Sequence, residues 1–153
     1  MAVYLFGLDA ATVASMRLAA QTPDTTANSP LDLALTEAAA EVGRAIWHAA
    51  NADPNGITEA DYPEDYQWCR SLVADGAVYF YTMSAQGTAS EEVSRRWNGG
   101  MNELGNQPAA LRFIAAQDST TFVHTHTSDL TQTQIDQYRS RIPTPERKGW
   151  GIA

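Results

Sequence analysis

The sequence predicts an all-α fold: a compact bundle of about four helices over residues 1–118, then an extended C-terminal arm over residues 119–153 that contains a short strand. Three observations support this prediction. The central segments open with helix-capping signals and end in turn residues. Within them, hydrophobic residues recur every three or four positions, which places them on one helix face. After Asp118, both the charge and the residue pattern change.

The N-terminal part predicts a short helix and then a linker. Asp9 is a suitable N-cap for a helix over residues 10–20, and residues 21–28 form a polar connection. The first long helix follows over residues 31–50. Ser29 caps this helix in our prediction, and its many alanines allow close packing against a neighbouring helix.

A turn over residues 51–56 separates this helix from a second long one, predicted over residues 61–85. Asp61, with Glu64 three positions later, resembles a capping box, and Pro63 suits the first turn. The hydrophobic stripe of this helix steps alternately by four and three residues: Tyr62, Tyr66, Cys69, Val73, Gly76, Phe80 and Met83. We therefore expect this face, Phe80 included, to lie in the core.

The third helix begins at Ser90, and its stripe is Val93, Trp97, Met101 and Leu104. Gly99 and Gly100 interrupt it, and each glycine costs about 1 kcal/mol relative to alanine. Either a bulky neighbour approaches the helix there, or the helix bends.

The remaining elements are shorter. Pro108 opens a last helix over residues 109–117, or residues 90–117 form one bent helix. Residues 119–127 are rich in β-branched side chains and predict a strand, and residues 131–141 suit a short helix.

Charge is unevenly distributed along the chain. Residues 1–118 carry 15 acidic residues and six arginines, a net charge of −9, whereas residues 119–153 carry +1 and include the only lysine, Lys148. An acidic body repels phosphate, so we expect no direct wrapping of nucleic acid. No hydrophobic run approaches the roughly 20 residues that span a bilayer, so no membrane partner is expected. The N-terminus lacks the basic region of a signal peptide.

The most acidic stretch is residues 51–65, which contain no basic residue. Two interpretations stay open. The stretch is a solvated loop whose last acids, Asp61 among them, cap the next helix. Alternatively, it presents an acidic surface to a partner or a channel, formed by Asp53, Glu59, Glu64 and Asp65.

The motifs give little sign of catalysis. His124 and His126 share one face of the predicted strand and supply two of the four ligands that zinc prefers, but the only other histidine is His48. Cys69 has no catalytic partner in the pattern, and no phosphate-binding loop is present. We therefore expect no enzyme, no metal and no cofactor. A small helical metal-binding protein that uses His124 and His126 is the alternative.

The arm contains hydrophobic residues that its local structure is too small to bury, so we expect a partner surface to cover them. These residues are Phe122, Val123, Ile135, Tyr138, Ile142 and Trp150.

The order of these features resembles the head-completion, or head–tail adaptor, proteins of tailed bacteriophages. The resemblance rests on the alanine-rich helix, the Pro-Gly loop and the proline-led helix that follows, whose segment from Trp68 to Tyr81 ends in aromatic residues. It rests also on the Glu91-Glu-Val-Ser-Arg-Arg-Trp97 segment. It also includes the C-terminal pattern Arg147-Lys148-Gly149-Trp150, and it spans roughly residues 29–117 plus the tail.

This resemblance implies a non-enzymatic virion protein, made in the host cytoplasm. Copies form a homo-oligomeric ring, commonly of twelve, below the portal protein. The ring extends the DNA channel toward the next tail or stopper protein, and DNA passes through without specific binding. A terminal arm docks on a neighbouring ring. Another phage role, as a tail-completion protein, is an alternative within the same class.

Overall fold

The computed structural model describes residues 5–123, with side chains described for residues 5–117. This part is helical throughout its regular structure, and no strand occurs in it. The chain divides into two compact units, Met1–Gln117 and Asp118–Ala153. In chain order the elements are the 3₁₀ turn η1 (Leu5–Gly7), α1 (Ala10–Arg17), α2 (Pro30–Ala50), the 3₁₀ turn η2 (Pro54–Gly56), α3 (Pro63–Gln86), α4 (Glu91–Asn106), the 3₁₀ turn η3 (Pro108–Ala110) and α5 (Arg112–Val123).

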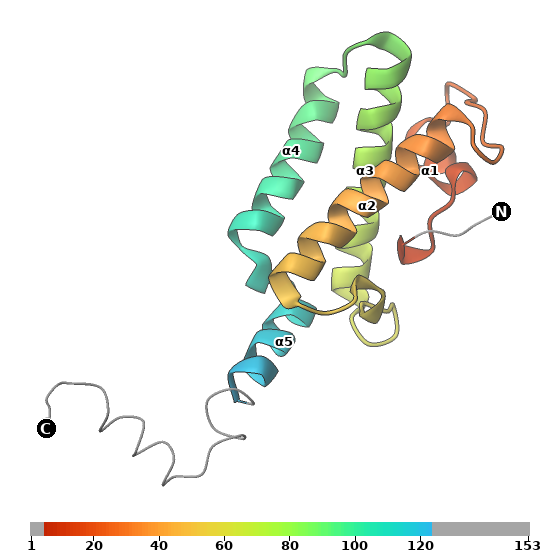
Figure 1. The fold of residues 1–153 in the computed structure, drawn as a ribbon. Helices are drawn as coiled ribbons and strands as arrows, with labels where there is room; N and C mark the ends of the chain where they lie inside the picture. The colour runs from red at the N-terminus through yellow and green to blue at the C-terminus, as the bar shows by residue number, and fades with distance from the viewer. Residues whose placement is uncertain (1–4, 124–153) are drawn as a thin grey trace, which may run out of the picture. The chain divides into compact units, whose positions relative to one another are not determined.

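Helix α3 is the central element of the first unit. It packs most extensively against α2, which crosses it obliquely, and next against α4, which runs antiparallel beside it (Figure 1). Gly87 allows the tight turn between α3 and α4, because its φ of 77° is left-handed. Helix α1 and η1 also pack on α3. The central helix is therefore covered from several sides.

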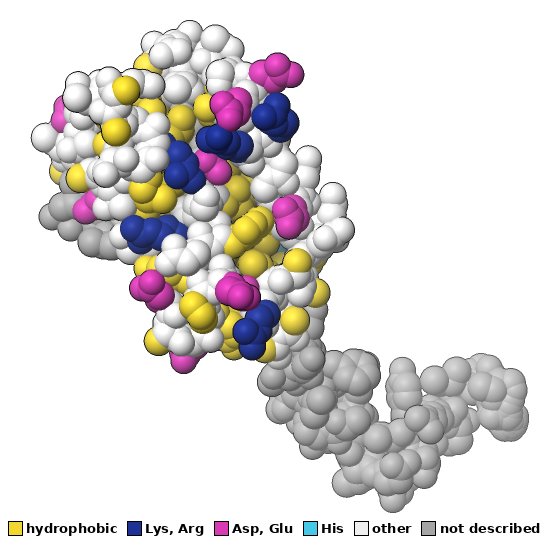
Figure 2. All heavy atoms as spheres, turned by 180° about the vertical axis from the view of Figure 1, so that it is seen from behind, with side chains coloured by type: hydrophobic (Ala, Val, Ile, Leu, Met, Phe, Trp, Pro, Cys, Tyr) yellow, Lys and Arg dark blue, Asp and Glu magenta, His cyan; other side chains and the backbone are white. Residues whose placement is uncertain are grey.

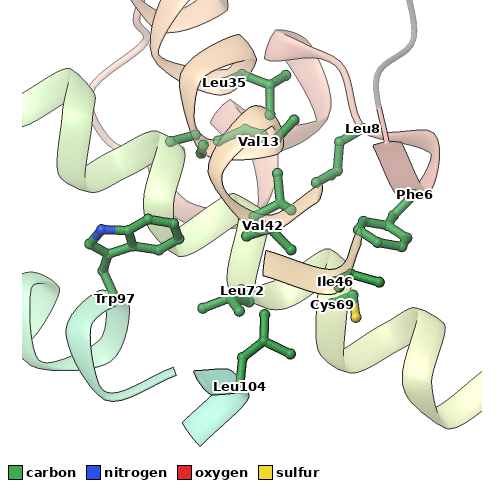
Figure 3. Close-up of a cluster of buried hydrophobic side chains, with 14 of the residues drawn as sticks. Phe6, Leu8, Val13, Leu35, Val42, Ile46, Cys69, Leu72, Trp97 and Leu104 are labelled. Carbon is green, nitrogen blue, oxygen red and sulfur yellow. The ribbon is translucent and has the colours of Figure 1, made fainter. Parts of the chain in front are cut away.

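The core lies where α2, α3 and α4 meet, and α1 and η1 complete it (Figure 3). Its largest fully buried side chains come from α1, α2, α3 and α5, and from Leu8 between η1 and α1. They are Leu8, Val13, Leu31, Leu35, Val42, Ile46, Cys69, Val73 and Ile114.

The predicted N-caps Asp9 and Ser29 are confirmed, and Ser90, predicted as the start of its helix, is also an N-cap. The side chains of Asp9, Ser29 and Ser90 accept hydrogen bonds from the backbone N–H groups of Thr12, Asp32 and Val93 respectively. Helix α1 nevertheless ends at Arg17, short of the predicted end at residue 20. The chain leaves the helical conformation at Leu18, whose side chain is buried in the core.

The predicted capping box at the start of α3 is wrong. Tyr62 occupies the N-cap position, and its side chain makes no capping bond. Asp61 is instead exposed and bonds to Thr58, both through its backbone N–H and through its carboxylate. The Thr58 carbonyl accepts the Tyr62 N–H at 2.8 Å, so a local turn satisfies the backbone before the helix begins.

The stripe predicted for α3 is correct in its middle and wrong at its ends. Cys69, Val73 and Gly76 are buried, whereas Tyr62, Tyr66 and Phe80 are half-buried and Met83 is 40% exposed. The structure also buries Leu72, Ala74, Ala77 and Val78. In the middle of α3 the buried face is wider than one stripe, because other helices cover α3 on more than one side. At the C-terminal end of α3 the buried face is narrower than the predicted stripe.

Glycine and tryptophan set the spacing between α3 and α4. A Cβ at Gly76 would lie 2.5 Å from Cζ3 of Trp97 and 2.9 Å from Cβ of Ala38, so three helices converge at this position. Trp97 also contacts two aromatic residues of α3: its ring stacks on Tyr79 and meets Phe80 edge to face. The close approach of α4 to α3 therefore depends on the missing side chain of Gly76.

The two glycines within α4 differ in their surroundings. A Cβ at Gly100 would overlap the side chain of Leu72, so a bulky neighbour does approach there. A Cβ at Gly99 would meet nothing within 4 Å, so no close neighbour explains a glycine at that position. Helix α4 runs without interruption, and residues 90–117 form two helices separated by η3.

The last helix differs from the prediction at both ends. Pro108 opens η3, and α5 begins at Arg112 and continues to Val123. Residues 119–123, predicted as the start of a strand, are therefore helical, because extending an existing helix costs less than forming a strand with no pairing partner. The rest of the predicted strand and the helix over residues 131–141 lie outside the described residues.

Candidate functional site

The acidic stretch after α2 is an ordered connection. Asn51 ends α2 in the left-handed conformation, with a φ of 53°. The Asp53 carboxylate then accepts the backbone N–H of Asn55 at 2.9 Å, which caps η2. Ile57 is buried and anchors the segment to the core. These local contacts fix the backbone of the connection and the position of the Asp53 carboxylate.

Three of the four predicted acidic surface residues are exposed. Asp53, Glu59 and Glu64 all face solvent. Glu59 accepts a hydrogen bond from the Gln67 amide at 3.2 Å, but none of the three forms an ion pair with a described residue. Their negative charge is therefore not neutralised by this part of the chain.

Asp65, the fourth predicted residue, does not belong to this exposed surface. It is 5% exposed, and its Oδ2 accepts the backbone N–H of Phe113 at 2.8 Å. One sequence signal marked this position: Asp65 lies three residues after Tyr62 and four before Cys69, so it falls on the buried side of the helix. The Asp65 carboxylate therefore binds the start of α5 and is not part of the predicted acidic surface.

A pocket of about 230 Å³ adjoins this buried carboxylate, between the start of α3, the end of α4 and the start of α5. Its lining mixes charged and hydrophobic side chains, and includes Glu64, Trp68, Glu103, Leu104, Leu111 and Arg112. A second hollow along the α3–α4 seam shares Trp68 and Glu103 with it. Figure 2, which views the molecule from behind, shows acidic, basic and hydrophobic side chains interleaved on that face. The lining contains no pairing of a nucleophile with a base, so the pocket suggests no reaction type.

Cys69 is unsuited to nucleophilic chemistry. Its side chain is fully buried, and burial raises the pKa of its thiol to about 12, with a further contribution from the negative charge of Asp65. The thiol therefore stays protonated at neutral pH.

Polar contacts between α1, η1 and α3 are structural. The Arg17 guanidinium pairs with Asp75 at 3.0 Å and donates to the Ser71 hydroxyl at 2.8 Å. Arg70 donates to the backbone carbonyl of Phe6 at 2.8 Å. Both arginines hold the N-terminal segment on α3.

No cluster of three or more potential metal ligands occurs among residues 5–117. His48 is exposed on α2. His124 and His126 lie outside the described residues, so the alternative that uses them stays a prediction.

The predicted arm interface also stays a prediction. Phe122 and Val123 belong to the last turn of α5, and their side chains are not described. The other members, Ile135, Tyr138, Ile142 and Trp150, lie outside the described residues.

The two most exposed of the large hydrophobic side chains in the described residues lie on one helix, outside the predicted site. Leu33 and Trp47, both on α2, are 56% and 50% exposed. Their helical spacing is visible in the sequence, but whether a helix face is covered depends on what packs beside it. Single exposed hydrophobic residues are ordinary, so their arrangement decides whether they matter.

Comparison with known proteins found no matching family model, no curated relative and no similar solved structure. Within the described part of the chain, no helix is long and hydrophobic enough to cross a membrane.

Proposed function

We propose that this protein is a structural subunit of the head–tail connector of a tailed bacteriophage. In this proposal, copies form a ring, of twelve subunits as in the family it resembles, between the portal protein and the next tail or stopper protein. The ring extends the DNA channel, and the protein has no catalytic role and no cofactor.

The observation that carries the proposal is the set of exposed carboxylates at Asp53, Glu59 and Glu64, which lie on the connection after α2 and in the first turn of α3. None of them forms an ion pair with a described residue. In a single subunit these charges repel weakly in water. A ring would bring one set from each subunit together into a strongly negative band. Such a band repels the phosphates of a passing duplex, or it attracts a basic surface on the adjacent ring.

The division of the chain is consistent with this role. The first unit is a helical body with a net negative charge, and the C-terminal unit carries the basic residues Arg147 and Lys148. Two units of different charge suit a subunit that joins two neighbours.

The test begins with electron microscopy of the purified full-length protein, alone and with its neighbouring virion proteins. Ring-shaped particles are expected. The second step is the triple substitution Asp53→Asn, Glu59→Gln and Glu64→Gln, which leaves Asp65 in place because it holds α5. We expect a folded subunit that docks more weakly or slows DNA passage, with a docking loss that shrinks at high salt.

The matched control is Glu41→Gln, Glu91→Gln and Glu92→Gln, which also removes three negative charges, but from α2 and α4. It is expected to assemble as the wild type does. Particles that assemble and deliver DNA normally with the Asp53, Glu59 and Glu64 variant would show these residues to be ordinary solvated surface.

A further inference from the structure

Helix α2 carries an outer face that no described residue covers. We call Leu33, Glu37, Ala40, Arg44 and Trp47 the α2 outer face; all five are exposed. Helix α2 lies in front of α3 in Figure 1. The residues are spaced by four, three, four and three, so at about 100° per residue they occupy an arc of roughly 80°. They form one narrow stripe along the helix.

The α2 outer face is nearly symmetrical in its chemistry about Ala40. Large hydrophobic side chains lie seven residues to either side, at Leu33 and Trp47. Opposite charges lie inside them, with Glu37 three residues before Ala40 and Arg44 four residues after it. A face with this order is complementary to itself when the second copy runs antiparallel.

We propose that two copies of this protein pair through the α2 outer face, with the helices antiparallel and a two-fold axis at Ala40. Leu33 then packs against the partner's Trp47, and Glu37 faces Arg44 of the partner subunit. Because of the two-fold symmetry, each of these contacts occurs twice in the dimer. The small side chain of Ala40 lets the two helices approach closely at the axis.

The charges on this face favour a second copy over an unrelated occupant. Within one chain, Glu37 and Arg44 are seven residues apart, about 10 Å along the helix, and cannot pair. Arg44 binds Glu41 at 2.9 Å, but a guanidinium has five N–H donors and accommodates a second carboxylate. Glu37 has no ion-pair partner in the described part of the chain. An antiparallel copy places Arg44 of the partner subunit opposite Glu37 and so gives this carboxylate an ion-pair partner.

A hollow beside Leu33 supports the same arrangement. It has a volume of about 210 Å³ and lies between α2 and α3, lined by Pro30, Leu33, Ala34, Glu37, Phe80 and Ser84. The two-fold axis brings the partner's Trp47 over Leu33, next to this hollow. Burial of the exposed indole there would remove hydrophobic surface of both copies from water.

The contact is small. From Leu33 to Trp47 the helix rises only about 21 Å, and one helix pair buries less surface than a permanent dimer needs. The dimer is therefore weak and depends on concentration. The contact does not rest on the connector role, because a closed two-fold contact differs from the head-to-tail contacts that build a ring.

Cysteine cross-linking of the full-length protein tests the axis. In Ala40→Cys the two new thiols face each other, and helix axes 8–10 Å apart place the two Cα atoms near the separation that a disulfide needs. We expect disulfide-linked dimers on mild oxidation. Ala60→Cys is the control, since Ala60 is also exposed but belongs to the connection between η2 and α3, outside the α2 outer face. Cys69 is buried and does not compete. Equal cross-linking of the two variants, or none in Ala40→Cys, would overturn the proposal.

Exchanging the charges at Glu37 and Arg44 tests which residues face each other across the dimer. The dimer Kd is measured by sedimentation at several protein concentrations. Glu37→Arg places arginines opposite one another and should raise the dimer Kd about tenfold. Adding Arg44→Glu restores opposite charges and should return the Kd to within about threefold of the wild-type value. If the double variant is as weak as the single one, the pairing of Glu37 with the partner's Arg44 is wrong. Both residues are exposed, so circular dichroism should show both variants folded.

Discussion

The Asp65 carboxylate at the start of α3 accepts the backbone N–H of Phe113 at the start of α5, at 2.8 Å. The two residues are 48 positions apart, and the bond is buried. Phe113 is the second residue of α5, a position whose N–H has no partner within its own helix. The residue before the helix, Leu111, has no polar side chain that could cap it, so the Asp65 carboxylate of α3 supplies the cap.

Loss of this bond should destabilise the protein. Asp65→Ala leaves a buried N–H without a partner and should lower the free energy of unfolding by about 1–3 kcal/mol. Urea unfolding measures the loss, and hydrogen exchange at Phe113 should accelerate. The control is Asp61→Ala, which removes an exposed carboxylate that caps no helix and should change stability by about 0.5 kcal/mol or less. A larger loss of stability in Asp61→Ala would indicate that Asp61 caps α3 after all, as the sequence predicted.

Two glycines should respond oppositely to the same substitution. Gly76→Ala forces a methyl group into Trp97 and Ala38 and should cost about 1–3 kcal/mol through overpacking. Gly99→Ala meets no atom within 4 Å and should stabilise α4 by up to about 1 kcal/mol. Thermal unfolding of both variants gives the comparison. A melting temperature raised by Gly76→Ala would mean that α4 can move away from α3 at little cost.

Cys69 should make stability depend on pH in the alkaline range. Its thiol pKa rises from 9.0 to about 12 on folding, mainly through burial. Above pH 9 the thiol ionises in the unfolded chain before it does in the folded one, so rising pH favours unfolding. Its contribution is complete below pH 9 and is lost progressively between pH 9 and 12. The wild type should therefore lose stability relative to Cys69→Ala, by at most about 1.4 kcal/mol per pH unit. Urea unfolding of both proteins at pH 8, 9.5 and 10.5 tests this, and a constant difference would contradict it.

Zinc should leave the melting temperature unchanged. His124 and His126 supply two ligands, too few for a stable zinc site. The wild type and the double variant His124→Ala, His126→Ala should melt alike with zinc and with a chelator. A chelator-sensitive wild type, with the sensitivity lost in the double variant, would favour the metal-binding alternative.

The features that were predictable depend on neighbouring residues in the chain. Asp9, Ser29 and Ser90 each cap a helix through an N–H three positions away, so the sequence pattern identifies them. The exposure of Asp53 and Glu59 follows similarly from their turn context.

The features that were missed depend on contacts between distant segments. The spacing of Asp65 from Tyr62 and Cys69 places it on the buried side of α3, but its partner, the Phe113 N–H, is 48 positions away in the sequence. Leu72 lies off the predicted stripe and is buried because Gly100 of α4 meets it. Residues 119–123 favour a strand by composition, but they continue a helix whose first turn is anchored in the core.

The aromatic contacts between α3 and α4 also have an optical consequence. Trp97 is 6% exposed, and its ring centroid lies 6.4 Å from that of Tyr79 and 5.5 Å from that of Phe80. An indole held rigidly among other rings gives a near-ultraviolet circular dichroism signal, which fades when side-chain packing loosens while the helices persist. Energy absorbed by Tyr79 also passes readily to so close an indole. The seam between these helices thus carries its own spectroscopic reporter, readable without any attached label.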